Sequence, residues 1–267
     1  MSAPLQGHRA RKRFGQNFLQ DPGVIRRIVK SIAPRDTDHL VEIGPGMGAI
    51  TELLLEAQPR LDVVELDRDL IPGLKVKFFN YPDFHVHEAD ALKFDFAGLC
   101  QNGEPLRIVG NLPYNISTPL IFHLLEFDGV IKDMHFMLQK EVVERLAARP
   151  GTSQWGRLSV MAQYFCDVEQ LFLVPPECFY PQPRVESAIV RLVPKNSQRE
   201  RVDLACFAKI VRQAFGQRRK TLRNNLKGLF TAENLLQLEI DPQRRPETLS
   251  LDEFISLARF QKHLSGD

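Results

Sequence analysis

Hydrophobic residues in the first half of the chain follow two alternating patterns. Short apolar runs of strand length occupy residues 39–44, 61–66, 84–89, 106–111 and 134–138. Apolar residues recur every three or four positions, as on one helix face, within 24–32, 49–57, 118–127 and 140–148. Strands that alternate with helices form βαβ units, so this half predicts an α/β fold around a parallel sheet.

The pattern changes after Pro150-Gly151, where strands and helices no longer alternate. A helical segment at 156–165 is followed by β-rich runs at 168–174 and 185–193, which a proline-rich loop at 175–183 connects. We expect these two runs to extend the sheet as a hairpin-like unit.

A polar, charged segment at 194–202 precedes a tail in which only helical spacing recurs. Ser250 and Glu253 fit a capping box at the start of the last helix. We therefore predict an α/β domain over residues 1–196 and a small all-helical C-terminal domain over residues 197–267.

The composition is that of an ordinary globular protein: of 267 residues, 43% are hydrophobic and 25% are charged, and the net charge is +2. No apolar run is long enough to span a bilayer, and the basic N-terminus lacks the apolar region of a secretory signal. The four cysteines are scattered and form no C-x-x-C pair. We therefore expect a cytoplasmic protein in a reducing compartment, without a membrane segment or a metal site.

Three glycines, Gly44, Gly46 and Gly48, follow the apolar run at 39–44 and open a helical segment. Glycine lets the backbone turn sharply and approach a ligand closely. The spacing G-x-G-x-G departs from the dinucleotide fingerprint G-x-G-x-x-G, and no Lys-Ser/Thr pair completes a phosphate-binding loop. The loop therefore indicates a ligand that lacks a pyrophosphate group.

Acidic residues lie at the ends of the next two predicted strands. Glu65 ends the second strand, and Asp90 follows the third. In doubly wound folds a carboxylate at the end of the second strand accepts hydrogen bonds from the ribose hydroxyls. An acid or its neighbouring backbone after the third strand can read an adenine edge. Together with the glycine loop, these positions predict a site for S-adenosylmethionine (SAM).

The sequence Gly110-Asn-Leu-Pro-Tyr114 follows the fourth predicted strand, at the edge where open α/β sheets bind ligands. The exocyclic amine of adenine is a poor nucleophile, because its lone pair is delocalised into the ring. The Asn111 side-chain oxygen and the Leu112 carbonyl can accept hydrogen bonds from that amine and free the lone pair. Tyr114 offers a flat face, and base–aromatic stacking contributes about 1–3 kcal/mol. Methyltransferases that act on glutamine amides use a similar turn, so the turn alone leaves both substrates open.

With these motifs in place, the chain resembles, along almost its whole length, the small-subunit ribosomal RNA adenine dimethyltransferases of the KsgA type. The segments that carry the resemblance are RKRFGQNFL (11–19), EIGPGMGAIT (42–51), ELD (65–67), EADAL (88–92), GNLPYNISTPL (110–120), HFMLQKEVVERL (135–146), GRLSVMAQY (156–164), FYPQPRVESAIVRL (179–192) and FGQRRKTLRNNL (215–226). The resemblance implies a SAM-dependent Rossmann-like domain and a helical C-terminal domain. It also implies N6,N6-dimethylation of two adjacent adenosines in the 3′-terminal hairpin loop of 16S rRNA.

The resemblance also implies roles for individual residues. Those implied to contact the cofactor are Asn17, Leu19, Gly44, Gly46, Glu65, Asp90 and Asn111. The implied catalytic residues are Asn111 between cofactor and target, Leu112 in the same turn, Tyr114 stacked on the target base, and Phe179 closing on its other side.

Basic residues cluster at two places although the net charge is small. One cluster precedes the first acid, Asp21, and the other lies between Asp203 and Glu233, which enclose no acid. Clustered positive charge is typical of nucleic-acid binders, although a solvated helix face has the same composition. We expect RNA contacts at Arg11, Lys12, Arg13, Arg218, Arg219, Lys220 and Arg223. The expected partner is 16S rRNA within the small ribosomal subunit or its precursor.

Other functions remain open at this point. Enzymes that dimethylate 23S rRNA share QNFL and a similar turn, but typically carry a lysine where this chain has Met47. A ribosome-assembly factor without catalysis would suit the basic tail. A methyltransferase of glutamine amides would need neither that tail nor Phe179. We expect a monomer, because the ribosome would be the partner.

Overall fold

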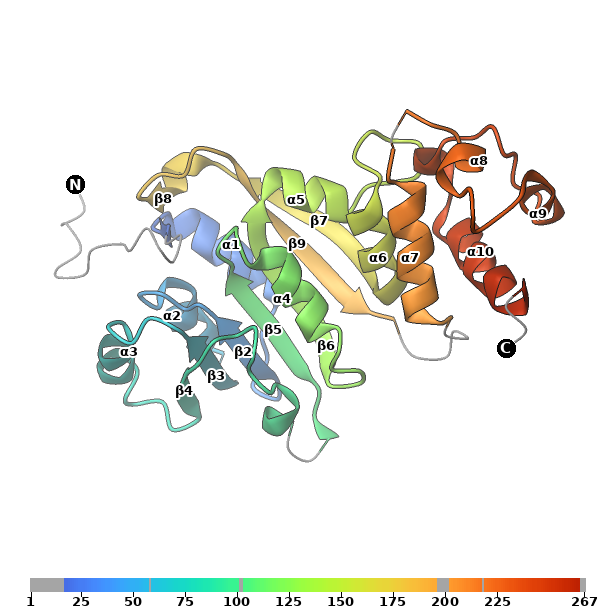
Figure 1. Cartoon of the computed structure of the whole chain (residues 1–267). Helices are drawn as coiled ribbons and strands as arrows, with labels where there is room; N and C mark the ends of the chain where they lie inside the picture. Colours follow the sequence, from blue (N-terminus) through green and yellow to red (C-terminus); the bar gives the residue numbers. More distant parts are fainter. Residues whose placement is uncertain (1–16, 58, 101–102, 196–201, 218, 265–267) are drawn as a thin grey trace. The chain divides into compact units, whose positions relative to one another are not determined.

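The computed structural model describes residues 17–57, 59–100, 103–195, 202–217 and 219–264. The chain forms two compact units, which are coloured along the sequence in Figure 1. The first comprises Met1–Val143 and Glu169–Pro194, and the second comprises Glu144–Val168 and Lys195–Asp267. Each unit has its own hydrophobic core.

The central element of the first unit is a seven-stranded sheet with the order β4-β3-β2-β5-β6-β9-β7. Its strands are β2 (His39–Ile43), β3 (Arg60–Glu65), β4 (Phe84–Glu88), β5 (Leu106–Asn111), β6 (Ile131–Gln139), β7 (Cys166–Val174) and β9 (Ser187–Pro194). Neighbours from β4 to β6 are parallel, whereas β9 runs antiparallel to β6. The structure confirms the predicted parallel sheet and its extension by the two late β-rich runs.

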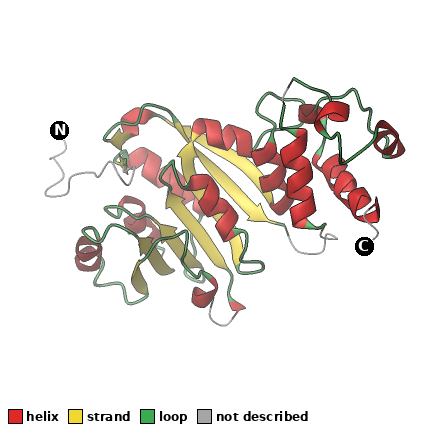
Figure 2. Ribbon diagram, in the orientation of Figure 1, coloured by secondary structure: helices red, strands yellow, loops and turns green. Residues whose placement is uncertain are grey.

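Helices connect the parallel strands and flank the sheet (Figure 2). They are α1 (Pro22–Ile32), α2 (Ala49–Leu55), α3 (Ile71–Lys77), α4 (Ser117–Leu124) and α5 (Lys140–Leu146), with short 3-10 turns η2 (Ala97–Leu99) and η4 (Pro176–Cys178). The Asp21 side chain caps α1 by accepting the Val24 N–H at 2.7 Å. The sequence analysis missed α3, because Pro72 and Gly73 are poor helix formers and the helix is short.

A buried ion-pair network ties α1 to the sheet. The Arg107 guanidinium on β5 donates to Asp133 on β6 at 3.0 Å and to Asp38 at 2.6 Å. It also donates to the carbonyl of Ile32, in the last turn of α1, at 2.6 Å. A cation at this position donates a hydrogen bond to a carbonyl that has no partner within the helix, and it interacts favourably with the negative end of the helix dipole.

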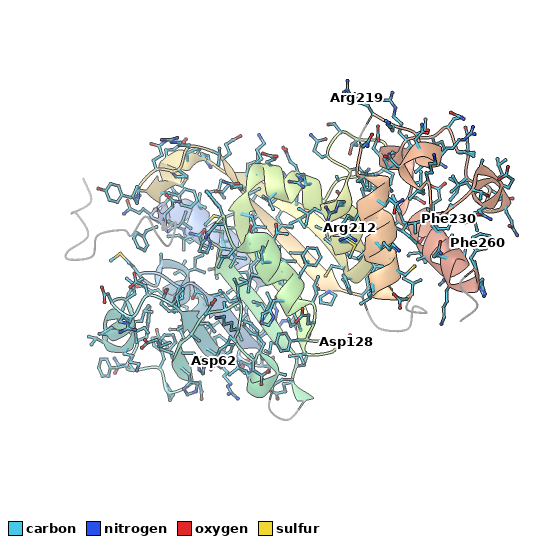
Figure 3. All side chains as sticks on the ribbon, in the orientation of Figure 1. Asp62, Asp128, Arg212, Arg219, Phe230 and Phe260 are labelled. Carbon is cyan, nitrogen blue, oxygen red and sulfur yellow. The ribbon has the colours of Figure 1, made fainter. Side chains whose placement is uncertain are left out.

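A second buried cluster lies across β2, β3 and β4, around the residue Asp62 that Figure 3 labels. His39 and His87 hydrogen-bond to its two carboxylate oxygens at 2.7 and 2.6 Å. Burial opposes ionisation of Asp62, but the two histidine hydrogen bonds outweigh it and hold the pKa of Asp62 well below its usual range. This carboxylate is therefore ionised throughout the neutral range.

A separate two-stranded sheet joins distant parts of the first unit. It consists of β1 (Phe18–Leu19) and β8 (Phe179–Tyr180), which pair antiparallel with Leu19 opposite Phe179. The proline-rich segment 175–183 was expected to be a loop. Strands of two residues are too short to show a periodic pattern, so this pairing could not be predicted from the sequence.

The second unit consists mainly of helices, which come from both of its chain segments. Its helices are α6 (Arg157–Phe165), α7 (Leu204–Ala214), α8 (Leu222–Asn225), α9 (Ala232–Gln237) and α10 (Leu251–Leu264), with the 3-10 turn η5 (Pro246–Thr248). Ser250 and Glu253 exchange the two hydrogen bonds of a capping box before α10, as predicted. None of the helices in the described ranges has the length and apolar character needed to cross a membrane.

The division into units differs from the predicted domains at residues 144–168 and at Lys195. Residues 144–168, which the sequence analysis assigned to the first domain, belong to the second unit. The physical reason is that Trp155 and Val160 are buried in the same core as Phe207 and Phe254. The Trp155 indole N–H also donates to the Leu249 carbonyl at 2.9 Å. The predicted boundary itself, at 196/197, falls in a segment that the structure does not describe.

Candidate active site

The glycine loop leaves the carboxyl end of β2 and enters α2. Gly44 and Gly46 have φ values of +66° and +59°, in the left-handed region that side chains rarely adopt. The Gly46 N–H donates to a Glu65 oxygen at 3.3 Å. A Cβ on Gly46 would lie 3.2 Å from the ring of Phe18 on β1. The loop therefore exposes bare backbone at the sheet edge and lies directly against the N-terminal strand.

Glu65 lies at the adjacent strand end, and its carboxylate is buried. Its other oxygen accepts the Asp67 N–H at 2.8 Å. Burial raises the pKa of Glu65, while the N–H groups of Asp67 and Gly46 counteract that rise. These bonds fix the orientation of the carboxylate at the point where the ribose hydroxyls are expected.

Glu42, one strand away, is an acid that the sequence analysis did not single out for a role. It is buried on β2 and accepts the Thr51 hydroxyl at 2.6 Å. Burial raises the pKa of Glu42 to about 7, against the lowering effect of the Thr51 bond, and the nearby Glu65 raises it further. Partial protonation of Glu42 near neutral pH therefore limits the negative charge beside Glu65.

Asp90 follows β4, the next strand of the sheet. One of its carboxylate oxygens accepts the Leu92 N–H at 3.0 Å. Because β2, β3 and β4 are neighbours and parallel, their carboxyl ends lie along one sheet edge. The glycine loop, Glu65 and Asp90 thus lie at the ends of three neighbouring strands, along one edge of the sheet.

Asn111 ends β5, on the other side of β2 from Glu65. Its side-chain nitrogen donates to the Asn17 carbonyl at 3.1 Å. A carbonyl can only accept, so this contact determines which end of the Asn111 amide points to Asn17. The amide oxygen is therefore directed away from Asn17.

The remaining turn residues are held by the surrounding chain. The Leu112 N–H donates to the Met137 carbonyl at 3.2 Å, and the Leu112 side chain is buried. The half-buried Tyr114 has its hydroxyl 3.0 Å from that of Ser187 on β9. Phe179 is buried in the core of the first unit, with Leu19.

The predicted RNA-contacting residues are only partly described. Arg11, Lys12, Arg13 and Arg218 lie outside the described residues. Arg219, Lys220 and Arg223 are exposed in the second unit, the last of them on α8. Figure 3 shows Arg219 extending outward from the ribbon. Within the described residues, no group of His, Cys, Asp and Glu side chains is arranged to hold a metal ion.

Three contacts at this site could not be found in the sequence. They involve the Asn17 carbonyl, the ring of Phe18 and the hydroxyl of Ser187. The bonds to Asn111 and Tyr114 join residues 94 and 73 positions apart. No local pattern signals such a pair.

The fold and the site define a class of protein: a Rossmann-like SAM-dependent methyltransferase, with its glycine loop and acidic strand ends on parallel strands. A family model described as "Ribosomal RNA adenine dimethylase" matches residues 7–262. The chain belongs to this family. Membership confirms the predicted fold class, the enzyme class of rRNA adenine dimethyltransferases, and SAM as the cofactor.

Similar proteins cover nearly the whole chain. The "Ribosomal RNA small subunit methyltransferase A" of Chromohalobacter salexigens is 64% identical over 263 residues, 97% of this chain and 93% of the relative. The protein of the same name from Pseudomonas aeruginosa is 60% identical over 264 residues, 98% of each chain. A crystal structure of a dimethyladenosine transferase from Plasmodium falciparum has a TM-score of 0.81 at 28% identity and covers 92% of this chain and 98% of its own. The 23S rRNA methyltransferase ErmE, with a TM-score of 0.74 at 24% identity over 92% of this chain and 100% of its own, shares the fold.

Proposed function

We propose that this protein transfers methyl groups from SAM to N6 of two adjacent adenosines in the 3′-terminal hairpin loop of 16S rRNA. The expected product is N6,N6-dimethyladenosine at both positions. Family membership and relatives at 60 and 64% identity that are named small subunit methyltransferases support this substrate. Within the site, the orientation of Asn111 carries the proposal, because the bond from its amide nitrogen to the Asn17 carbonyl leaves the amide oxygen, an acceptor, pointing away from Asn17.

Asn111 and Leu112 act on the target amine. Its lone pair is delocalised into the adenine ring, so the nitrogen needs help to become nucleophilic. Two acceptors, the Asn111 oxygen and the Leu112 carbonyl, bind the two N6 hydrogens and draw the nitrogen toward tetrahedral geometry. With SAM bound, the N6 lone pair would form the new N–C bond while the S–C bond breaks and its electron pair stays on the sulfur as a thioether; the N6 proton would then pass to solvent water. The acceleration of methyl transfer comes from the positioning of the reactants and from electrostatic stabilisation, and no strong base is required.

Tyr114 provides the face on which the target adenine stacks, and Phe179, which is buried beside Leu19 in this structure, would have to turn toward the base to close on its other side. Base–aromatic stacking of this kind contributes about 1–3 kcal/mol. A base in a hairpin loop is already unpaired, so moving it into the pocket requires less free energy than extracting it from a duplex. We expect a regular duplex to be a poor substrate.

The residues of the first unit fit the cofactor. Gly44 and Gly46 offer uncovered backbone where a side chain would meet Phe18 or strain the turn. Glu65 would hold the ribose hydroxyls and Asp90 would read the adenine, with Leu19 on β1 and the preceding Asn17 contacting the cofactor. When bound, SAM supplies the sulfonium methyl group.

The rRNA contacts are proposed for the basic residues of the N-terminal segment and of the predicted C-terminal domain. Arg219, Lys220 and Arg223 are exposed in a stretch without acids, as phosphate contacts require. Each phosphate contact that is lost should reduce the slope of log K against log salt by about 0.7–0.9. Arg223→Ala should show this reduction in a filter-binding titration, and Lys262→Ala, an exposed cation on α10, serves as the control. An unchanged slope for Arg223→Ala would remove that residue from the interface.

The protein is proposed to act as a monomer on the small subunit or its precursor, in the cytoplasm. A role in subunit biogenesis goes with this substrate, because a protein that leaves only after methylation can act as a checkpoint. If so, an Asn111→Ala protein should dissociate from precursor subunits more slowly than the wild type. Equal dissociation rates would separate the chemistry from release.

The substrate is tested with labelled SAM. We expect label to enter small subunits that lack this modification and to approach two methyl groups on each of two adjacent adenosines. Naked DNA, 23S rRNA and a release factor serve as controls. Label in 23S rRNA or in the protein control instead would assign the chain to those reactions. SAM binding without label in any substrate would favour an assembly factor that does not catalyse.

A further inference from the structure

A hydrogen bond joins the two hydroxyl groups of Tyr114 and Ser187 at 3.0 Å. Ser187 is the first residue of β9 and is fully buried, whereas Tyr114 is partly exposed in the turn after β5. The contact is therefore a bond between a fixed interior group and the outer end of a ring that faces the proposed target site.

The backbone around Ser187 is rigidly placed. Ser187 is paired with Gln139 at the end of the β6–β9 ladder. Beside it, the Lys140 N–H donates to the Glu186 carbonyl at 2.9 Å, and the Lys140 ammonium donates to the Glu186 carboxylate at 2.7 Å. The Ser187 hydroxyl is consequently a stationary anchor.

Tyr114 is held at both ends. The Ser117 hydroxyl donates to the Tyr114 carbonyl at 3.2 Å, which fixes the backbone of the turn. The bond to Ser187 fixes the far end of the side chain. A tyrosine side chain has two main torsions, and a bond at its hydroxyl restricts rotation of the ring about both. The plane of the ring is thereby set relative to Asn111, three residues earlier in the same turn.

We propose that Ser187 is a positioning residue that fixes the plane of Tyr114 and is needed chiefly for the second methyl transfer to each adenosine. This inference rests on the proposed function. Unmodified adenine has two N6 hydrogens and can engage both the Asn111 oxygen and the Leu112 carbonyl. After the first transfer only one N6 hydrogen remains, so one of these hydrogen bonds is lost.

The two transfers therefore depend differently on stacking. In the first, two hydrogen bonds and the ring stack orient the base. In the second, one hydrogen bond and the stack must do so, and the base carries an additional methyl group. Loss of the tether leaves Tyr114 free to rotate, and this freedom affects the second transfer more than the first.

The experiment compares Ser187→Ala, Tyr114→Phe and the double variant with the wild type. Single-turnover rates are measured on small ribosomal subunits whose 3′-terminal hairpin has unmodified adenosines and on subunits carrying N6-methyladenosine at the same positions. For either single variant we expect the second transfer to slow about tenfold more than the first, the effect of one lost hydrogen bond. Because the two hydroxyls act through one bond, the double variant should be no slower than the single variants.

Ser159→Ala is the matched control, because Ser159 is also fully buried and hydrogen-bonded but lies in the second unit. It should leave the ratio of the two rates unchanged. If Ser187→Ala does not fold, Tyr114→Phe decides, since its ring is retained and its hydroxyl is lost. Equal slowing of both transfers, or effects that multiply in the double variant, would overturn the inference. A wild type that methylates neither kind of subunit would instead contradict the proposed function.

Discussion

Gly110 lies on β5 directly opposite Ile43 of β2, at the point where the two strands meet the site. A Cβ at this position would stand 2.6 Å from the Ile43 carbonyl oxygen and 3.0 Å from a Leu112 side-chain carbon. Close carbon–oxygen contacts lie at about 3.3 Å or more, so Gly110→Ala must displace backbone by roughly 0.7 Å. The neighbouring Asn111 must move with it.

The expected loss in activity follows from that displacement. A misplacement of about 1 Å reduces a rate by about 10²-fold, so the kcat of Gly110→Ala should fall by roughly tenfold to 10²-fold. The overpacking should also lower the free energy of unfolding by about 1–3 kcal/mol. Both are measured on purified protein, by methyl transfer to saturating small subunits and by urea denaturation.

Gly73→Ala is the control, since a Cβ at Gly73 on α3 would meet no atom within 4 Å. It should retain wild-type kcat and gain about 0.5–1 kcal/mol of stability, because alanine is the better helix former. Wild-type kcat for Gly110→Ala would refute the reasoning that links this strand position to Asn111.

Further predictions concern the cofactor site and the buried charges. Glu65→Gln should weaken SAM binding about tenfold or more in isothermal titration calorimetry, because a hydrogen bond to a charged group contributes about 1.5–3 kcal/mol; unchanged affinity would contradict the ribose assignment. Arg107→Ala leaves Asp38 and Asp133 buried without their cation and should lower the free energy of unfolding by about 3–5 kcal/mol, whereas a near-neutral result in a urea titration would show that the network contributes little. The folded pKa of Asp62 lies below its unfolded value of about 3.9, so its stabilisation is present above that pH and is lost as the pH falls toward the folded pKa. Asp62→Asn should therefore have a lower free energy of unfolding at pH 7, and in urea titrations its stability should fall less steeply than that of the wild type as the pH is lowered. An unchanged fall at acid pH would count against the hydrogen bonds from His39 and His87.

Much of the fold could be predicted because the central strands β2, β3 and β5 are largely buried and rich in apolar residues. All five residues of β2 are buried, and its run of apolar residues stood out in the sequence. The α3 helix was missed because Pro72 and Gly73 mask it. The assignment of residues 144–168 was also missed, because periodicity identifies α6 as a helix but does not say which core its buried face joins.

The site, like the fold, contains some features that the sequence predicts and others that it does not. Gly46, Glu65 and Asp90 could be proposed as site residues because each lies at or shortly after the end of a strand, and parallel strands bring their ends together. The partners that orient Asn111 and Tyr114 were not found. These contacts depend on the tertiary fold, through the two-stranded sheet β1–β8 in one case and the antiparallel strand β9 in the other.

The central claim is that Asn111 directs methyl transfer to N6 of two adjacent adenosines. It is tested most directly by nucleoside mass spectrometry of 16S rRNA after unmodified small subunits are incubated with SAM and either wild-type protein or Asn111→Ala. The account predicts N6,N6-dimethyladenosine at both adjacent positions with the wild type, and its near absence with a variant that still binds SAM. Dimethyladenosine at wild-type levels with Asn111→Ala, or modification of another base by the wild type, would contradict it.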